Sequence, residues 1–186
     1  MHVAALVASR VECVALIETL GPWTTAADKI PRQLAKSLTQ RVHRPQRVHA
    51  SLEAAAVANS KGFLKTPLAA TRVMVARGTR PAAGPGGSRG YVWRADPRLR
   101  ELSRQPMTTD TVRAFASAVA CPVLVVTAAD GIYSKRDPEE VQRRLSYYKH
   151  LTHVVLDSGG HHCHLVQPQP VTDRVLQFFA RCHSPA

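Results

Sequence analysis

The sequence predicts an α/β fold built on a partial doubly wound parallel sheet, and three observations indicate it. Residues 11–18 and 121–129 are apolar and rich in β-branched side chains, as strands covered on both faces are. Strand and helix patterns alternate from residue 121 to the end of the chain, which is typical of parallel sheets. With 186 residues, 45% of them hydrophobic and 20% charged, the chain can bury a core of useful size.

The first strand lies close to the N-terminus. Residues 2–9 have the composition of the last turns of a helix, and residues 11–18 follow as a nearly continuous apolar strand. Gly21-Pro22 ends that strand, because neither residue continues a regular ladder.

The middle of the chain is helical in pattern. Three helices are expected, at residues 26–42, 47–58 and 67–77. A Pro/Gly loop is expected at 80–90, and residues 91–104 are aromatic and basic without a clear period.

The last third alternates helix and strand. A helix begins at residues 108–110 and precedes the strand at 121–129. The next three elements are a helix over 137–149, a strand over 153–157 and a closing helix over 169–182. Asp137 and Pro138 suit the positive end of the first of these helices.

The chain is basic, and the charge is concentrated in the middle region. Lys and Arg number 25 against 13 Asp and Glu, a net charge of +12, and residues 24–104 hold 16 of the cations but only 4 of the acids. The cations are scattered, without a run of five like charges. Two interpretations follow: a solvated basic surface, or a site for a polyanion.

Cysteine usage and hydropathy bear on the compartment. The four cysteines show no Cys-x-x-Cys pair, so we expect reduced thiols and a cytoplasmic location. No apolar run reaches the length of a membrane span, and Met1 to Ser9 lacks the basic leader of a signal peptide. No cofactor or metal is expected: adjacent side chains in residues 161–164 point apart and cannot all bind one ion.

The sharpest chemical pattern joins Asp130 and His161. Asp130 directly follows the strand at 121–129, and His161 follows the strand at 153–157 after two glycines. Catalytic groups of parallel sheets lie beyond the carboxyl ends of the strands, so the two side chains are expected at one edge of the same crevice. A carboxylate beside imidazole Nδ1 leaves Nε2 free to act as a base. The alternative is a turn role for Asp130 and a helix-cap role for His161.

Several segments, in order along the chain, resemble the C-terminal portion of the α/β-hydrolase superfamily, in its serine hydrolase-like branch. Residues 160–168 match the Gly-His-x-x-His-Leu-x-x-Pro block that ends many of these enzymes. Residues 121–131 resemble their penultimate strand and acid turn, residues 11–22 the strand before the lid, and residues 90–98 a lid segment.

The resemblance implies an organisation and an activity. It divides the chain into a core strand at 1–22, a helical lid insertion at 23–118, and C-terminal core elements at 119–186. It implies hydrolysis of an ester or related bond of a small molecule by a Ser-His-acid relay, with His161 as base and Asp130 as acid. Glu18 is an alternative acid, because haloalkane dehalogenases place theirs after the strand that precedes the lid.

The family's nucleophile elbow has no counterpart here, so the chain is expected to be inactive alone, as a fragment or a mispredicted start. Gly86 to Gly90 fits Gly-x-Ser-x-Gly around Ser88, but an elbow requires a buried strand before the serine and a helix after it. Ser88 is expected to have neither a buried strand before it nor a helix after it.

Other functional classes stay open. The chain could be a basic, non-enzymatic binding module for a polyanion, or a non-functional remnant. Tyr91 and Trp93 lie among arginines, but aromatic residues are only 5% of the chain, and nucleic acid is not expected as a partner. Self-association is expected, because a sheet of three strands leaves the edge of strand 11–18 exposed.

Overall fold

The computed structural model describes residues 1–39 and 46–183, which form two units. The sheet unit comprises residues 1–27 and 107–186, and the insert unit comprises residues 28–106. The segment expected as a lid, 23–118, is longer than the insert unit at both ends. Its last helix belongs to the sheet unit because Val112 and Ala116 are buried there.

The sheet has three parallel strands. They are β1 (Val14–Ile17), β4 (Val123–Ala128) and β5 (Leu151–Leu156), in the spatial order β1-β4-β5. Both pairings are parallel, with Ile17 beside Val126 and Val126 beside Val154. The predicted parallel sheet and the predicted order of its strands are confirmed.

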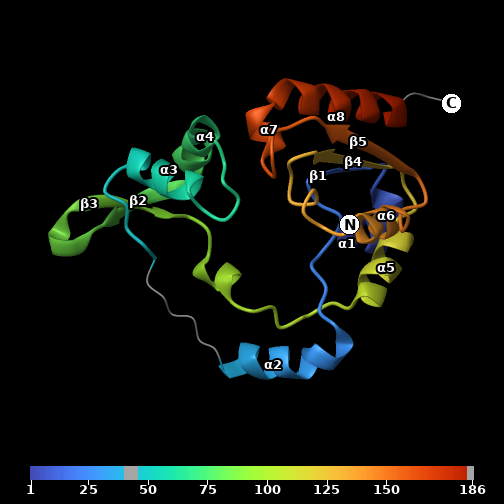
Figure 1. Cartoon of the computed structure of the whole chain (residues 1–186), viewed down its shortest axis with the longest axis horizontal. Helices are drawn as coiled ribbons and strands as arrows, with labels where there is room; N and C mark the ends of the chain where they lie inside the picture. Colours follow the sequence, from blue (N-terminus) through green and yellow to red (C-terminus); the bar gives the residue numbers. More distant parts are fainter. Residues whose placement is uncertain (40–45, 184–186) are drawn as a thin grey trace. The chain divides into compact units, whose positions relative to one another are not determined.

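Helices cover both faces of this sheet (Figure 1). The helix α8 (Pro168–His183) packs on one face through Val171 and Phe178, and the short α7 (Cys163–Val166) precedes it. The other face carries α1 (His2–Leu6), α5 (Thr109–Ser117) and α6 (Pro138–Leu145). All six residues of β4 are buried as a result, which explains its unbroken apolar sequence.

Two of these helices begin at the residues that the sequence indicated. The Thr108 hydroxyl accepts a hydrogen bond from the Thr111 backbone N–H at 3.1 Å, which caps α5. Asp137 caps α6 by accepting from the Glu139 N–H at 3.0 Å, with Pro138 in the first turn.

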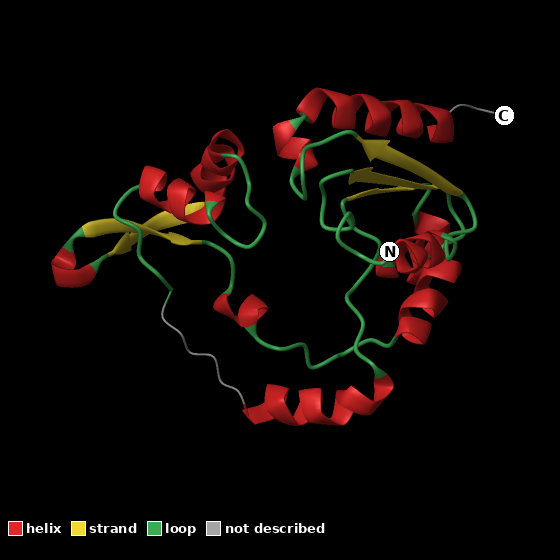
Figure 2. Cartoon of the chain, in the orientation of Figure 1, coloured by secondary structure: helices red, strands yellow, loops and turns green. Residues whose placement is uncertain are grey.

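The insert unit combines helices with a β-hairpin (Figure 2). Its helices are α2 (Ile30–Thr39), α3 (Leu52–Ser60) and α4 (Leu68–Gly78), and its antiparallel strands are β2 (Thr79–Ala83) and β3 (Arg89–Trp93). Residues 40–42 of the helix expected at 26–42 lie outside the described residues.

Short 3₁₀ turns occur in both units. The described ones are η1 (Ala8–Arg10), η2 (Ala27–Lys29), η3 (Pro85–Gly87) and η4 (Pro97–Arg100).

The hairpin corrects the loop expected at 80–90. Gly86 and Gly87 take positive φ angles of 68° and 79°, which suits the turn between β2 and β3. The core of this unit is small, with Ala55, Ala56 and Val75 buried against Trp93. None of the helices in the described residues is long and apolar enough to cross a membrane.

Candidate functional site

Glu18 is a buried carboxylate at the end of β1. Its side chain has 0% exposure, and its φ of 49° is unusual for a residue other than glycine. Oε1 accepts a hydrogen bond from the Ala128 N–H at 2.7 Å, and Oε2 accepts one from the Ile132 N–H at 2.9 Å. The last residue of β4 and the turn after it therefore supply the donors that a buried carboxylate requires.

Gly131 provides the space for this carboxylate. A Cβ at position 131 would collide with both Glu18 carboxylate oxygens. The glycine that the sequence places directly after Asp130 is thus explained by close approach of a charged side chain to the backbone.

His161 faces the same carboxylate from the loop after β5. Its Nδ1 lies 3.7 Å from Glu18 Oε2, and the side chain is 29% exposed. This separation suits an ion pair but is too long for a hydrogen bond, and Nδ1 is buried without a hydrogen-bond partner. Gly159 and Gly160, with φ of 121° and 61°, form the turn that brings the imidazole there.

Asp130 contacts the backbone of that turn. Its Oδ1 accepts a hydrogen bond from the Gly160 N–H at 2.8 Å, and the residue is exposed. In the structure it is the Glu18 carboxylate, not that of Asp130, that lies within ion-pair distance of the imidazole. The ion pairs of the described residues join His161 to Glu18 and include none between His161 and Asp130. The reason is that Glu18 reaches beneath the turn after β4, while Asp130 is occupied by the Gly160 amide.

Two further buried groups lie near Glu18. The Tyr133 hydroxyl accepts a hydrogen bond from the Leu20 N–H at 2.7 Å, and burial raises the pKa of Tyr133. Burial, and next the charge of Glu18, raise the pKa of the Cys163 thiol. Sequence reasoning missed Tyr133, because a tyrosine after an acid turn carries no specific signal.

The neighbouring histidines do not assemble a metal site. The rings of His161 and His162 lie 4.9 Å apart, and those of His162 and His164 lie 5.8 Å apart. Burial lowers the pKa of both His162 and His164, with the charge of His161 as the next cause. Within residues 1–39 and 46–183, no three His, Cys, Asp or Glu side chains are grouped as ligands for one ion.

Ser88 lies in the hairpin turn of the insert unit. The Gly84 N–H donates to its backbone carbonyl, and β3 begins at the next residue. The serine is therefore flanked by strands of a hairpin, not by the strand and helix of a nucleophile elbow.

Comparison with known proteins supports the fold at two levels of similarity. No family model and no curated protein matches the chain. A hypothetical protein from Pseudomonas aeruginosa PAO1 is 31% identical with a TM-score of 0.82, over 96% of this chain and 62% of that one. An esterase from Mycobacterium tuberculosis is 17% identical with a TM-score of 0.62, over 95% of this chain and 57% of that one.

A peroxisomal α/β-hydrolase from Saccharomyces cerevisiae is also similar, at 14% identity and a TM-score of 0.65, over 98% of this chain and 50% of that one. Together with the motifs at residues 121–131 and 160–168, these likenesses show that the chain has the α/β-hydrolase fold. The chain spans about three fifths of the length of the Pseudomonas protein, 62%.

Proposed function

We propose that this chain supplies the histidine and the acid of a hydrolase that cleaves an ester or related bond in a small molecule. The observation that carries the proposal is the 3.7 Å approach of Glu18 Oε2 to His161 Nδ1. A buried, fixed carboxylate after β1 and a partly exposed imidazole after β5, the two strands that flank β4, are the arrangement that a proton relay requires.

Glu18 is the acid of the proposed relay. Facing Nδ1, it favours the tautomer that leaves Nε2 unprotonated, and it stabilises the imidazolium when Nε2 takes a proton. Its two backbone hydrogen bonds hold it in place. The 3.7 Å separation is compatible with a relay, since catalytic hydrogen bonds are often long in ligand-free sites.

Asp130 has a different role in this proposal. By accepting from the Gly160 N–H, it fixes the turn that carries His161. It is a positioning residue, because it acts on the backbone of the histidine turn and not on the imidazole. The motif resemblance implied Asp130 as the acid with Glu18 as the alternative, and this proposal adopts the alternative.

The ester or related bond is what the α/β-hydrolase resemblance implies, and the relay would act on it through two proton transfers. His161 Nε2 would take the proton of a serine hydroxyl as that oxygen attacks the carbonyl carbon, and would then protonate the leaving alcohol. The printed sequence holds no Gly-x-Ser-x-Gly between a buried strand and a helix. We therefore expect the 186-residue chain alone to show little or no turnover.

The test is hydrolysis of p-nitrophenyl butyrate by the chain, with a fluorophosphonate probe to detect an activated serine. We expect no turnover above the His161→Ala variant and no labelling. If turnover appears and His161→Ala abolishes it, the hydrolase assignment stands and the expected inactivity is wrong. Turnover that survives His161→Ala would contradict the proposed role of His161.

A further inference from the structure

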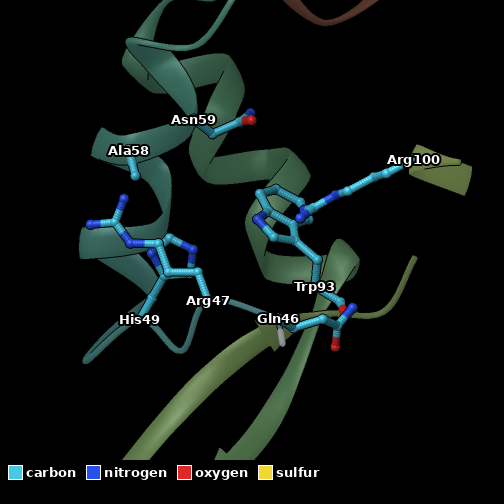
Figure 3. A pocket seen from close by; sticks show the side chains of 7 residues that line it. All are labelled: Gln46, Arg47, His49, Ala58, Asn59, Trp93 and Arg100. Carbon is cyan, nitrogen blue, oxygen red and sulfur yellow. The ribbon is translucent and has the colours of Figure 1, made fainter. Parts of the chain in front are cut away.

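The insert unit contains a pocket of its own, with a volume of about 240 Å³ (Figure 3). It lies apart from the candidate relay in sequence and unit, since Glu18, Asp130 and His161 all belong to the sheet unit. Its walls come from the segment before α3, from α3 itself, from the end of β3 and from η4. The lining residues are Gln46, Arg47, His49, Ala58, Asn59, Trp93 and Arg100.

The wall before α3 is held rigidly against the hairpin. His49 and Tyr91 exchange two backbone hydrogen bonds, each of 2.8 Å. A Cβ at Gly90 would lie 2.5 Å from the Val48 side chain, so the two segments pack as closely as glycine allows. The Gln46 carboxamide donates to the carbonyls of Trp93 and Ala95, each at 3.0 Å. These contacts within the protein shape the pocket, so its formation does not depend on a ligand.

The lining is cationic and contains no carboxylate. Arg47 and Arg100 are exposed, and no ion pair joins either of them to another residue within the described chain. Three other arginines of the unit are paired: Arg72 contacts Glu53 at 2.7 Å, Arg98 contacts Asp96 at 2.5 Å and Arg104 contacts Glu101 at 3.9 Å. Two guanidinium groups thus remain available at one concave site.

The pocket also has a flat apolar surface and a buried imidazole. Figure 3 shows the Arg100 side chain pointing toward the Trp93 indole, with Arg47 and His49 on the other side of the pocket. His49 is only 6% exposed, and burial, followed by the charge of Arg47, lowers its pKa. A neutral imidazole adds hydrogen-bonding capacity without another full charge.

We propose that this pocket binds a small organic anion in which a carboxylate or phosphate is joined to a flat apolar group. Arg47 and Arg100 hold the anion, because the guanidinium fork pairs with both groups in a bidentate manner. Trp93 packs against the flat group. The pocket volume of about 240 Å³ limits the ligand to the size of one ring with its charged substituent. This site is additional to the proposed relay and does not depend on it.

The experiment is calorimetric titration of the full chain with phenyl phosphate, benzoate, inorganic phosphate and benzyl alcohol. We expect phenyl phosphate or benzoate to bind, and the better of the two identifies the anion. Neutral benzyl alcohol and inorganic phosphate should each bind at least about ten-fold more weakly. The alcohol lacks the anionic group that the arginines bind, and inorganic phosphate lacks the ring that packs on Trp93. Equal binding of benzyl alcohol, or equal binding of inorganic phosphate, would overturn the assignment.

Matched variants distinguish binding in this pocket from non-specific attraction of anions to a basic surface. Arg47→Gln and Arg100→Gln should each weaken binding of the preferred probe by about ten-fold or more. Arg80→Gln, which removes the same charge from an exposed position of β2 outside the pocket, should leave it unchanged. An equal loss in all three variants, or no binding of any probe, would refute the site. Circular dichroism confirms that each variant is folded.

Discussion

The sheet unit and the insert unit differ in both charge and packing. Residues 1–27 and 107–186 carry 9 cations and 9 acids, whereas residues 28–106 carry 16 cations and 4 acids. The sheet unit buries a complete strand, β4, between helical layers, whereas the buried apolar residues described in the insert unit are three alanines and two valines, Val75 and Val92. The proposed relay therefore lies in the unit with equal numbers of cations and acids and the larger buried core. The excess positive charge lies in the unit with the smaller core.

Core truncations should show this difference most strongly. Leu124→Ala, in β4 with 1% exposure, should cost about 3 to 4 kcal/mol of stability, because it leaves a cavity between the sheet and α8. Val75→Ala, at the same exposure in the insert unit, removes fewer methyl groups and should cost about half as much. Hydrogen exchange by mass spectrometry follows each unit separately. Equal losses in the two units would contradict the comparison.

Gly131→Ala should have the next largest effect. The added methyl group displaces the Glu18 carboxylate from its backbone donors, which should cost about 2 to 3 kcal/mol. Gly86→Ala is the control, because no atom lies within 4 Å of its Cβ position and only its positive φ opposes the change, at about 1 kcal/mol. Urea denaturation measures both. A smaller loss for Gly131→Ala than for Gly86→Ala would mean that Glu18 is not held as described.

The free edge of β1 leads to a prediction about association. Within the described residues β1 pairs with β4 alone, so we predict that the chain self-associates. The N–H groups of Val14 and Glu18 point to β4, so that of Ala15 points outward. Ala15→Pro should therefore block the edge while keeping the β1–β4 ladder. Light scattering should show oligomers for the parent chain and a shift towards monomer for the variant. A monodisperse parent monomer would contradict this prediction.

The smallest expected effect concerns pH. Burial lowers the pKa of His153, whose Nε2 lies 2.9 Å from Thr127 Oγ1. The folded state therefore binds this proton less readily than the unfolded chain, and stability should fall as pH decreases below about 6.5. Thermal melts at pH 7.5 and 5.5 should differ less in His153→Gln than in the parent. The exposed His150→Gln is the control, and an equal flattening in that variant would contradict the assignment.

The sequence allowed most of the sheet unit to be predicted. Continuous apolar runs marked β1 and β4, and capping residues marked α5 and α6. The hairpin β2–β3 was missed, because Pro81 and the glycines at 84–90 resemble a loop when the long-range pairing with residue 49 is unknown. Local composition cannot reveal such a pairing.

The candidate site was only partly predicted, because one of its features also depends on three-dimensional structure. The positions of Glu18, Asp130 and His161 after neighbouring strands were readable from the pattern of strands and glycines. Which carboxylate faces the imidazole depends on the positive φ of Glu18 and on the space above Gly131. Neither property is visible in a linear sequence, so the resemblance favoured Asp130.

The most direct measurement is the tautomer of the neutral His161 imidazole, read from its ¹⁵N chemical shifts. We predict a proton on Nδ1, facing Glu18 Oε2. Glu18→Gln should shift the proton to Nε2, because the carboxamide cannot accept from both the Ala128 and Ile132 amides and turns its NH₂ group towards Nδ1. Asp130→Asn should change the tautomer much less. A shift to Nε2 in Asp130→Asn, with Glu18→Gln unchanged, would contradict the central claim.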